Sequence, residues 1–339
     1  MVEESTGAGG GGEPDFSAAR PLLQTGCSDP GPVLVVTGAT ATGKTRLAVD
    51  LARSLGGEVI SMDSRQVYRG MDIGTAKPAE AERGGVPHHG FDLVRPDQRY
   101  SAGRFAADAR AWIKDIRQRR RLPILAGGTG FFLRALTHPM FREPQLDAER
   151  RAALRAYLNG RSADELQRWT LGLDPGYEPG AWRGGGRQRL MRRIEVAALT
   201  GRPLSWWQRN SPAAEPPVST VVVVLDWPRV DLYARIDRRV HDMVAAGLLD
   251  EVARLMDEGY TATDPGMSAT GYAEFIPVVR AERSIGEAVR LTQAATRRYA
   301  RRQLTWVRNQ IRGAIHVDAT RSPDELCSVV IREWKGAAS

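Results

Sequence analysis

One stretch of the sequence decides the fold: Gly38-Ala39-Thr40-Ala41-Thr42-Gly43-Lys44-Thr45. It matches the phosphate-binding loop pattern, in which glycines let backbone amides approach an anion and a helix N-terminus follows. Lys44 adds a positive charge, and the Thr45 hydroxyl can hold a magnesium ion that bridges phosphate oxygens. The loop predicts a bound phosphate ester, but the pattern does not identify which one.

Apolar runs and helical patterns alternate around this loop. Residues 33–37, 59–62 and 122–126 have the pattern of buried strands, and residues 44–55 and 104–119 have that of helices. This alternation predicts an α/β fold with a parallel sheet, helices on both of its faces, and ligands beyond the carboxyl ends of the strands. The fold class expected from the pattern is therefore α/β, a parallel sheet with helices on both faces and a mostly helical insertion.

The pattern changes along the chain and divides it into segments. Residues 1–31 are rich in Gly, Ser, Pro and Glu without an apolar period, which is typical of a disordered leader. A strand at 218–225 and a helix at 230–246 resume the core, and the chain is then nearly all helical, ending in an arginine-rich helix at 287–311. The predicted organisation is a leader at 1–31, a catalytic core at 32–136 and 217–318, a helical insertion at 137–216, and a C-terminal segment at 319–339.

Composition excludes several classes of protein. The chain has 339 residues with 48 Lys+Arg against 40 Asp+Glu, a balance that favours a polyanionic partner but is also that of an ordinary solvated basic surface. No run approaches the roughly 20 apolar residues of a membrane span, and no secretory signal opens the chain, so we expect a soluble cytoplasmic protein with no membrane partner. The only cysteines, Cys27 and Cys327, exclude a disulfide framework and a cysteine-rich zinc site.

Two further groups of residues follow the predicted strands. Asp63-Ser64-Arg65-Gln66 follows the second strand, and Asp63 has three possible roles: ligating magnesium, capping the next turn, or accepting a proton from a nucleophile. Gly127-Gly128-Thr129-Gly130 follows the third strand, where glycines allow a substrate or a backbone to approach closely. The adjacent His88 and His89 lack a third ligand at a suggestive spacing, so we expect a structural role and not a metal site.

From these residues outward, the chain resembles the bacterial tRNA dimethylallyltransferases, adenosine prenyltransferases whose fold is related to P-loop nucleotide kinases. The resemblance extends from about Pro32 to Arg312. Besides the loop and Asp63-Ser64, it rests on Gln66, Tyr68, Met71-Asp72-Ile73-Gly74-Thr75-Ala76-Lys77-Pro78, Pro87-His88, Tyr100-Ser101-Ala102, Gly127-Gly128-Thr129, Arg189 to Val196, Thr200-Gly201, Leu204-Ser205, Arg235 to Arg239, Gly271-Tyr272 and Arg301-Arg302-Gln303-Leu304-Thr305-Trp306.

The resemblance implies that the loop holds the diphosphate of dimethylallyl diphosphate, with Mg²⁺ on Thr45. It assigns two catalytic residues: Asp63 as the general base for an adenine exocyclic amine, and Thr129 as a contact of the target nucleotide. Of Arg235 and Arg239, which we expect to face different ways, it assigns Arg239 to the leaving group. The diphosphate-binding residues are then Gly38, Ala39, Thr40, Ala41, Thr42, Gly43, Lys44, Thr45 and Arg239.

The resemblance also implies a nucleic-acid partner, the tRNA anticodon stem-loop, clasped by the helical insertion of a monomeric enzyme. A stacked adenine cannot reach a buried diphosphate, so the base must be extruded into a channel. The expected tRNA-binding residues are Asp63, Ser64, Arg65, Gln66, Thr129, Arg151, Gln188, Arg189, Leu190, Met191, Arg192, Gly271, Tyr272, Arg301, Arg302, Gln303, Thr305, Trp306 and Arg308.

Some positions depart from the family pattern. Ala39 and Phe132 stand where proline and tyrosine are usual, and Gly185-Gly186 replaces a usual Asn-Asp pair before Gln188. Two other functions share parts of this pattern. A small-molecule or nucleotide kinase has the same sheet and loop but needs ATP, and a non-catalytic RNA-binding protein is disfavoured by the intact Lys44, Thr45 and Asp63.

Overall fold

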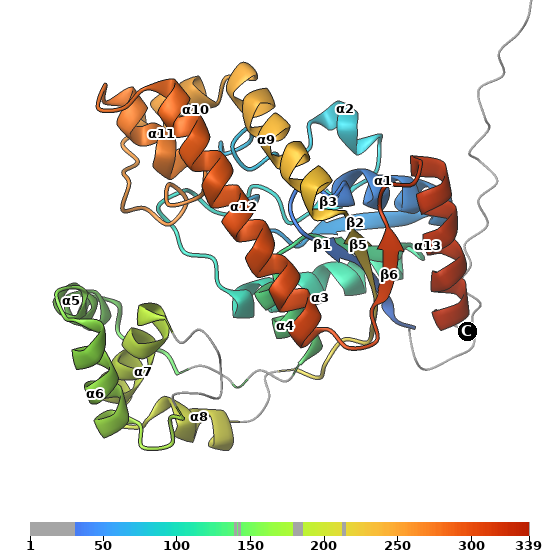
Figure 1. Ribbon diagram of the computed structural model, residues 1–339. Helices are drawn as coiled ribbons and strands as arrows, with labels where there is room; N and C mark the ends of the chain where they lie inside the picture. The colour runs from blue at the N-terminus through green and yellow to red at the C-terminus, as the bar shows by residue number, and fades with distance from the viewer. Residues whose placement is uncertain (1–30, 139–140, 142–143, 179–185, 212–214, 339) are drawn as a thin grey trace, which may run out of the picture. The chain divides into compact units, whose positions relative to one another are not determined.

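The computed structural model has a sheet of six parallel strands at its centre (Figure 1). The strands lie in the order β3-β2-β4-β1-β5-β6, so β1 has β4 and then β2 on one side and β5 on the other. The carboxyl ends of β1, β4 and β2 therefore lie side by side, and the predicted α/β fold is confirmed. The strands are β1 (Val33–Gly38), β2 (Gly57–Ser61), β3 (His88–His89), β4 (Leu122–Ala126), β5 (Thr220–Asp226) and β6 (Ile315–Asp318).

Helices cover both faces of this sheet. Leu34, Val36 and Ile124 pack with α1 and α13 on one face. On the other face α3 lies against β2 and β4, and α4 packs on α3. Because buried parallel strands need cover on both faces, the apolar runs in the sequence are continuous and not alternating. The helices of this part are α1 (Lys44–Leu55), α2 (Glu80–Arg83), α3 (Ala102–Gln118), α4 (Gly130–Thr137), α9 (Arg229–Ala245), α10 (Leu248–Asp257), α11 (Tyr272–Val279), α12 (Ile285–Gln310) and α13 (Pro323–Ala338).

The chain divides into two compact units, and the second unit is residues 138–217. It contains α5 (Ala148–Asn159), α6 (Ala163–Leu173), α7 (Arg187–Thr200) and α8 (Leu204–Asn210). Leu158, Leu166 and Met191 are fully buried at its centre. Glu195 is also buried, and its carboxylate accepts hydrogen bonds from Arg151 at 3.0 Å and Arg155 at 2.7 Å.

Helix α12 is long because its first turn is capped and its sequence contains no proline. The Ser284 hydroxyl accepts a hydrogen bond from the Glu287 amide and caps the first turn. No proline falls between Ile285 and Gln310. Its buried face includes Ala300, Gln303 and Val307, so the second half of the helix carries one polar side chain, that of Gln303, into the protein.

A buried carboxylate fixes the motif at residues 71–78. Glu251 on α10 accepts hydrogen bonds from the amides of Asp72, Ile73 and Gly74 at 2.9 to 3.1 Å. The hydroxyl of Tyr272, which is fully buried, donates to the same carboxylate at 2.5 Å. A Cβ on Gly74 would lie 2.4 Å from the Tyr272 ring, so glycine is required there. This motif is therefore held in place by the α10–α11 pair.

The structure describes residues 31–138, 141, 144–178, 186–211 and 215–338. Nearly all of the predicted leader, and Gly185 of the Gly185-Gly186 pair, lie outside these residues. Strand β6 corrects the expectation that the chain is nearly all helical after residue 246. In the described part of the chain, no helix combines the length and apolar character that a membrane span requires.

Candidate active site

The first part of the candidate site is the loop between β1 and α1, residues 39–43. Across the described residues, the amides of 41–45 donate to no protein group, as expected of a helix N-terminus that holds an anion. Gly43 has a φ of 93°, which favours glycine, and a Cβ on Gly38 would lie 2.9 Å from the Leu225 carbonyl oxygen. The Thr40 amide is used differently, because it donates to Gln303 Oε1 at 2.8 Å.

Lys44, Arg239 and the Asp63 carboxylate lie at this loop. Lys44 Nζ donates to the Ala39 carbonyl oxygen at 2.6 Å, and Arg239 Nη1 donates to Thr40 Oγ1 at 3.1 Å. Burial and the positive charge of Arg239 lower the pKa of Lys44 from 10.5 to about 8, and the Asp63 carboxylate opposes this effect. Burial also lowers the pKa of Arg239, again opposed by Asp63. The site therefore gathers positive charge that an anion would stabilise.

Asp63 and Thr129 lie together at the ends of β2 and β4. Asp63 Oδ1 accepts a hydrogen bond from the Arg65 amide at 2.8 Å, so this carboxylate does cap the turn that follows it. The Thr129 hydroxyl accepts a hydrogen bond from the Ser64 amide at 3.0 Å and lies 3.4 Å from Ser64 Oγ. In the described chain Asp63 Oδ2 accepts no hydrogen bond, so capping leaves this oxygen available to a substrate.

The glycines after β4 make room for protein and not only for a ligand. A Cβ on Gly127 would lie 2.1 Å from the Met62 carbonyl oxygen. Substitution of Gly128 or Gly130 would collide with Gln303 or Trp306 of α12, at 2.1 and 2.2 Å. Gln303 also donates through Nε2 to the Gly128 carbonyl oxygen at 2.9 Å, so it bridges this turn and the phosphate loop.

Tyr299 is a site residue that the sequence did not reveal. Its side chain is half-buried, and the Arg302 guanidinium lies 5.6 Å from the centre of its ring. Burial and the Asp63 charge raise the pKa of Tyr299 to about 12, and a hydrogen bond with Thr129 opposes the shift. Tyr299, Gln303 and Trp306 share one helical face at spacings of four and three residues, and this spacing is the signal that was available.

Arg235 differs from its prediction. We expected Arg235 and Arg239 to face different ways, but residues four apart lie on the same face of a helix. Arg235 Nε donates to the Ala41 carbonyl oxygen at 2.8 Å, so both arginines of α9 contact the loop.

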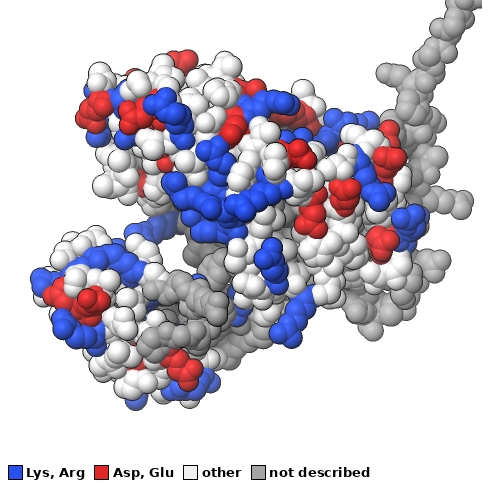
Figure 2. Space-filling view, in the orientation of Figure 1, with Lys and Arg blue, Asp and Glu red and all other residues white. Residues whose placement is uncertain are grey.

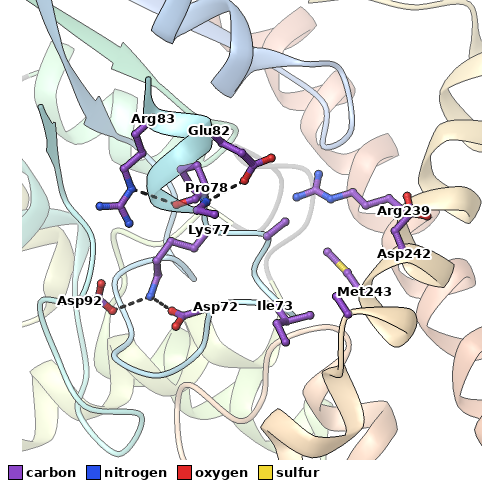
Figure 3. A pocket seen from close by; sticks show the side chains of 13 residues that line it. Asp72, Ile73, Lys77, Pro78, Glu82, Arg83, Asp92, Arg239, Asp242 and Met243 are labelled. Carbon is purple, nitrogen blue, oxygen red and sulfur yellow. Dashed lines mark hydrogen bonds and ion pairs between the residues drawn. The ribbon is translucent and has the colours of Figure 1, made fainter. Parts of the chain in front are cut away.

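A cavity of about 540 Å³ adjoins Arg239 (Figure 3). Lys77 lies in its wall between Asp72 and Asp92, with Nζ 2.6 Å from Asp92 Oδ1, so its charge is balanced locally. Ile73 and Met243 add apolar surface. Because Arg239 both lines the cavity and contacts Thr40, it connects this cavity to the loop.

The residues at the loop fit a magnesium ion only together with a substrate. Thr45 is exposed in the first turn of α1, and no group of three His, Cys, Asp or Glu side chains suited to a metal occurs in the described part of the chain. Magnesium prefers oxygen ligands and keeps several waters, so a diphosphate would have to supply ligands beside the Thr45 hydroxyl.

The predicted RNA contacts of the core fall into two groups. Arg301, Arg302, Thr305 and Arg308 are exposed, and Figure 2 shows basic side chains gathered across the middle of α12. The side chains or amides of the others contact protein groups. Gln66 donates to the Thr75 and Ala76 carbonyl oxygens, Tyr272 donates to Glu251, and Gln303 donates to the Gly128 carbonyl oxygen. Arg65 donates to the Pro265 carbonyl oxygen, the Gly271 amide donates to Glu274, and Trp306 packs on Gly130. An RNA contact by Tyr272 would have to use its backbone.

The predicted RNA contacts of the second unit divide in the same way. Gln188 and Arg189 are exposed, whereas Leu190 and Met191 belong to the apolar core of the unit. Arg151 pairs with Glu195, and Arg192 lies 3.8 Å from the same carboxylate. RNA binding by any of these residues stays a prediction.

The sheet, the loop and the charges around it define a P-loop α/β protein with a site suited to an anion. A model of the IPP transferase family matches residues 66–310, and a model of isopentenyl transferases matches residues 31–94. The chain belongs to the IPP transferase family, which confirms the resemblance inferred from its motifs.

Its relatives cover most of the chain. A tRNA dimethylallyltransferase of Anaeromyxobacter sp. (strain Fw109-5) is 44% identical over 87% of this chain and 97% of its own length. The solved tRNA isopentenylpyrophosphate transferase of Bacillus halodurans is 34% identical, with a TM-score of 0.66 over 90% of this chain and 96% of that one. A solved eukaryotic dimethylallyltransferase acting on tRNA is 27% identical, with a TM-score of 0.72 over 89% of this chain and 77% of that one.

The lowered pKa of Lys44 predicts a pH-dependent affinity for diphosphate. In the free protein Lys44 is charged below pH 8 and loses its proton as the pH rises through about 8. An anion in the loop favours the charged amine, so above that pH binding must take up a proton, and the Kd rises by up to about tenfold per pH unit. Calorimetry with inorganic diphosphate in metal-free buffer at several pH values measures this.

Lys44→Arg is the matched control because arginine stays charged throughout this range. It should retain only the pH dependence that belongs to diphosphate itself. The same pH dependence in the variant and the wild type would contradict the assignment to Lys44.

Proposed function

We propose that the protein transfers a dimethylallyl group from dimethylallyl diphosphate to the exocyclic N6 amine of the adenosine immediately 3′ of the anticodon in tRNAs. The observation that carries the proposal is the adjacency of two groups: the anion site expected at residues 38–45, and a carboxylate at Asp63 that acts electrostatically on Lys44 and Arg239. The names of the relatives, tRNA dimethylallyltransferases, agree with it.

The proposed transfer forms a bond between N6 and the allylic carbon while the bond from that carbon to the diphosphate oxygen breaks. The N6 proton moves to the Asp63 carboxylate, whose Oδ2 is the available acceptor. The amine is a poor nucleophile, because its lone pair is delocalised into the ring. Proton removal on one side and neutralisation of the leaving diphosphate on the other therefore both lower the barrier.

The leaving group is held by the inward amides of the loop together with Lys44 and Arg239. Magnesium, when bound with the diphosphate at Thr45, would add positive charge to the departing oxygens. Thr129 lies where it can contact the extruded base, since its hydroxyl is already oriented by the Ser64 amide at 3.0 Å. The positions of these groups around the loop support the proposed roles.

The RNA partner is proposed to be the anticodon stem-loop. The exposed arginines of α12 provide phosphate contacts, and the second unit offers the exposed Gln188 and Arg189 as contacts of its own. An unpaired loop nucleotide can be extruded at lower cost than a paired base. A cytoplasmic location and a monomeric state stay predictions.

Asp63→Asn tests the chemistry. With anticodon stem-loop RNA, magnesium and labelled dimethylallyl diphosphate, the wild type should transfer label. The variant should lose about 10² to 10⁴-fold in kcat, because the amide cannot take the proton, and should keep its RNA affinity. Asp97→Asn, an exposed aspartate paired with Arg95, is the control and should behave as wild type.

Two outcomes would count against this function. Equal losses of kcat and RNA affinity in Asp63→Asn would remove its role as base. ATP-dependent phosphorylation of a small molecule, without label transfer to RNA by the wild type, would favour a kinase.

Arg301→Ala tests the RNA surface of α12. Loss of one phosphate contact should weaken RNA binding and reduce the slope of log K against log salt concentration by about one, with diphosphate affinity unchanged. Arg332→Ala, an exposed arginine on α13, is the matched control. An unchanged salt slope in Arg301→Ala would take this residue out of the RNA interface.

A further inference from the structure

Two side-chain N–H groups donate to backbone carbonyl oxygens of the phosphate loop, on the side facing away from the expected anion. Arg235 Nε donates to the Ala41 carbonyl oxygen at 2.8 Å, and Trp227 Nε1 donates to the Thr42 carbonyl oxygen at 3.1 Å. The two donors also support each other, since the Arg235 guanidinium lies 4.3 Å from the centre of the Trp227 ring. They come from the segment after β5 and from α9, both more than 180 residues away in the sequence.

The direction of these carbonyls decides the direction of the next amides. In a trans peptide the C=O of one residue and the N–H of the next point in opposite directions. With the Ala41 and Thr42 carbonyls bonded on the outside, the amides of Thr42 and Gly43 must point to the inside of the loop. Those are the amides that donate to no protein group in the described chain.

The backbone needs this support because Ala41 has an unfavourable conformation. Its φ is 65°, in the left-handed region that residues with a Cβ rarely adopt. Such a conformation persists only where surrounding contacts over-determine it. The hydrogen bond from Arg235 falls on the carbonyl of Ala41 itself, so it holds this residue directly.

We propose that Arg235 and Trp227 are positioning residues that keep the loop amides turned inward and thereby set the affinity for diphosphate. The identity of the anion rests on the proposed function. Arg239, one turn further along α9, donates to the Thr40 side chain. Arg235 therefore contacts the backbone of the loop, and Arg239 contacts one of its side chains.

Calorimetry with inorganic diphosphate tests the proposal on the full-length protein. Arg235→Met removes the donor but keeps the aliphatic length, and Trp227→Phe removes Nε1–H but keeps a ring. Each should raise the Kd for diphosphate about 3- to 10-fold, the range expected for one hydrogen bond. Affinity for stem-loop RNA and the melting temperature should change little. Arg229→Met is the control, because Arg229 also lies on α9 but donates through Nε to the Tyr233 hydroxyl and not to a loop carbonyl.

A second variant separates positioning from general destabilisation. Glycine adopts positive φ without strain, so Ala41→Gly in the Arg235→Met background should recover part of the lost diphosphate affinity. Arg235→Lys, which keeps a donor, should lose less than Arg235→Met. Unchanged diphosphate affinity in both Arg235→Met and Trp227→Phe would overturn the proposal. So would losses of diphosphate affinity, RNA affinity and melting temperature in parallel, without recovery by Ala41→Gly.

The outcomes also distinguish this inference from the function on which it rests. Diphosphate binding by the wild type without prenyl transfer to RNA would overturn the function and leave the positioning role standing. Prenyl transfer with wild-type diphosphate affinity in both variants would overturn the positioning role alone.

Discussion

An anion site made of peptide amides works only while the carbonyls of the same peptides point away from it. In this protein that constraint falls on residues 41–45, whose amides donate to no other group in the described chain. Several elements of the core hold the loop in the conformation that this constraint requires. Strand β1 delivers the chain to the loop, α1 carries it away, and α9 and the segment after β5 bind the outward carbonyls.

The order of the strands then determines what lies beside the anion. Because β4 and β2 follow β1 in the sheet, the residues after their carboxyl ends, Thr129 and Asp63, lie next to the loop. Positive charge gathers at Lys44 and Arg239, where a diphosphate would depart, and negative charge lies at Asp63, where a proton would arrive. Helix α12 links two of these segments, because Gln303 accepts a hydrogen bond from the loop and donates one to the turn after β4.

The sequence could predict what depends on local pattern. The strand, loop and helix at residues 33–55 follow from apolar runs and glycine spacing, and the sheet edge at Asp63 and Thr129 follows from the βαβ alternation. The family resemblance added the substrate and the choice of Arg239.

What could not be predicted depends on contacts between distant segments. Tyr299 meets Thr129 across 170 positions of sequence, and nothing local to either residue indicates the pairing. Gln66 and Tyr272 stand in motifs expected at the RNA, yet their side chains are buried, because the carbonyls at 75 and 76 and the Glu251 carboxylate provide their partners. Strand β6 is four residues long, too short for its period to show.

The most direct test of the central claim is the amide NMR spectrum of the protein, selectively labelled in the loop, as inorganic diphosphate is added. If the inward amides hold the anion, the signals of residues 41–45 should shift downfield together and become protected from exchange. The Thr40 amide, already bonded to Gln303, should change least. Shifts confined to side chains, or a Thr40 amide that moves as much as its neighbours, would contradict the account.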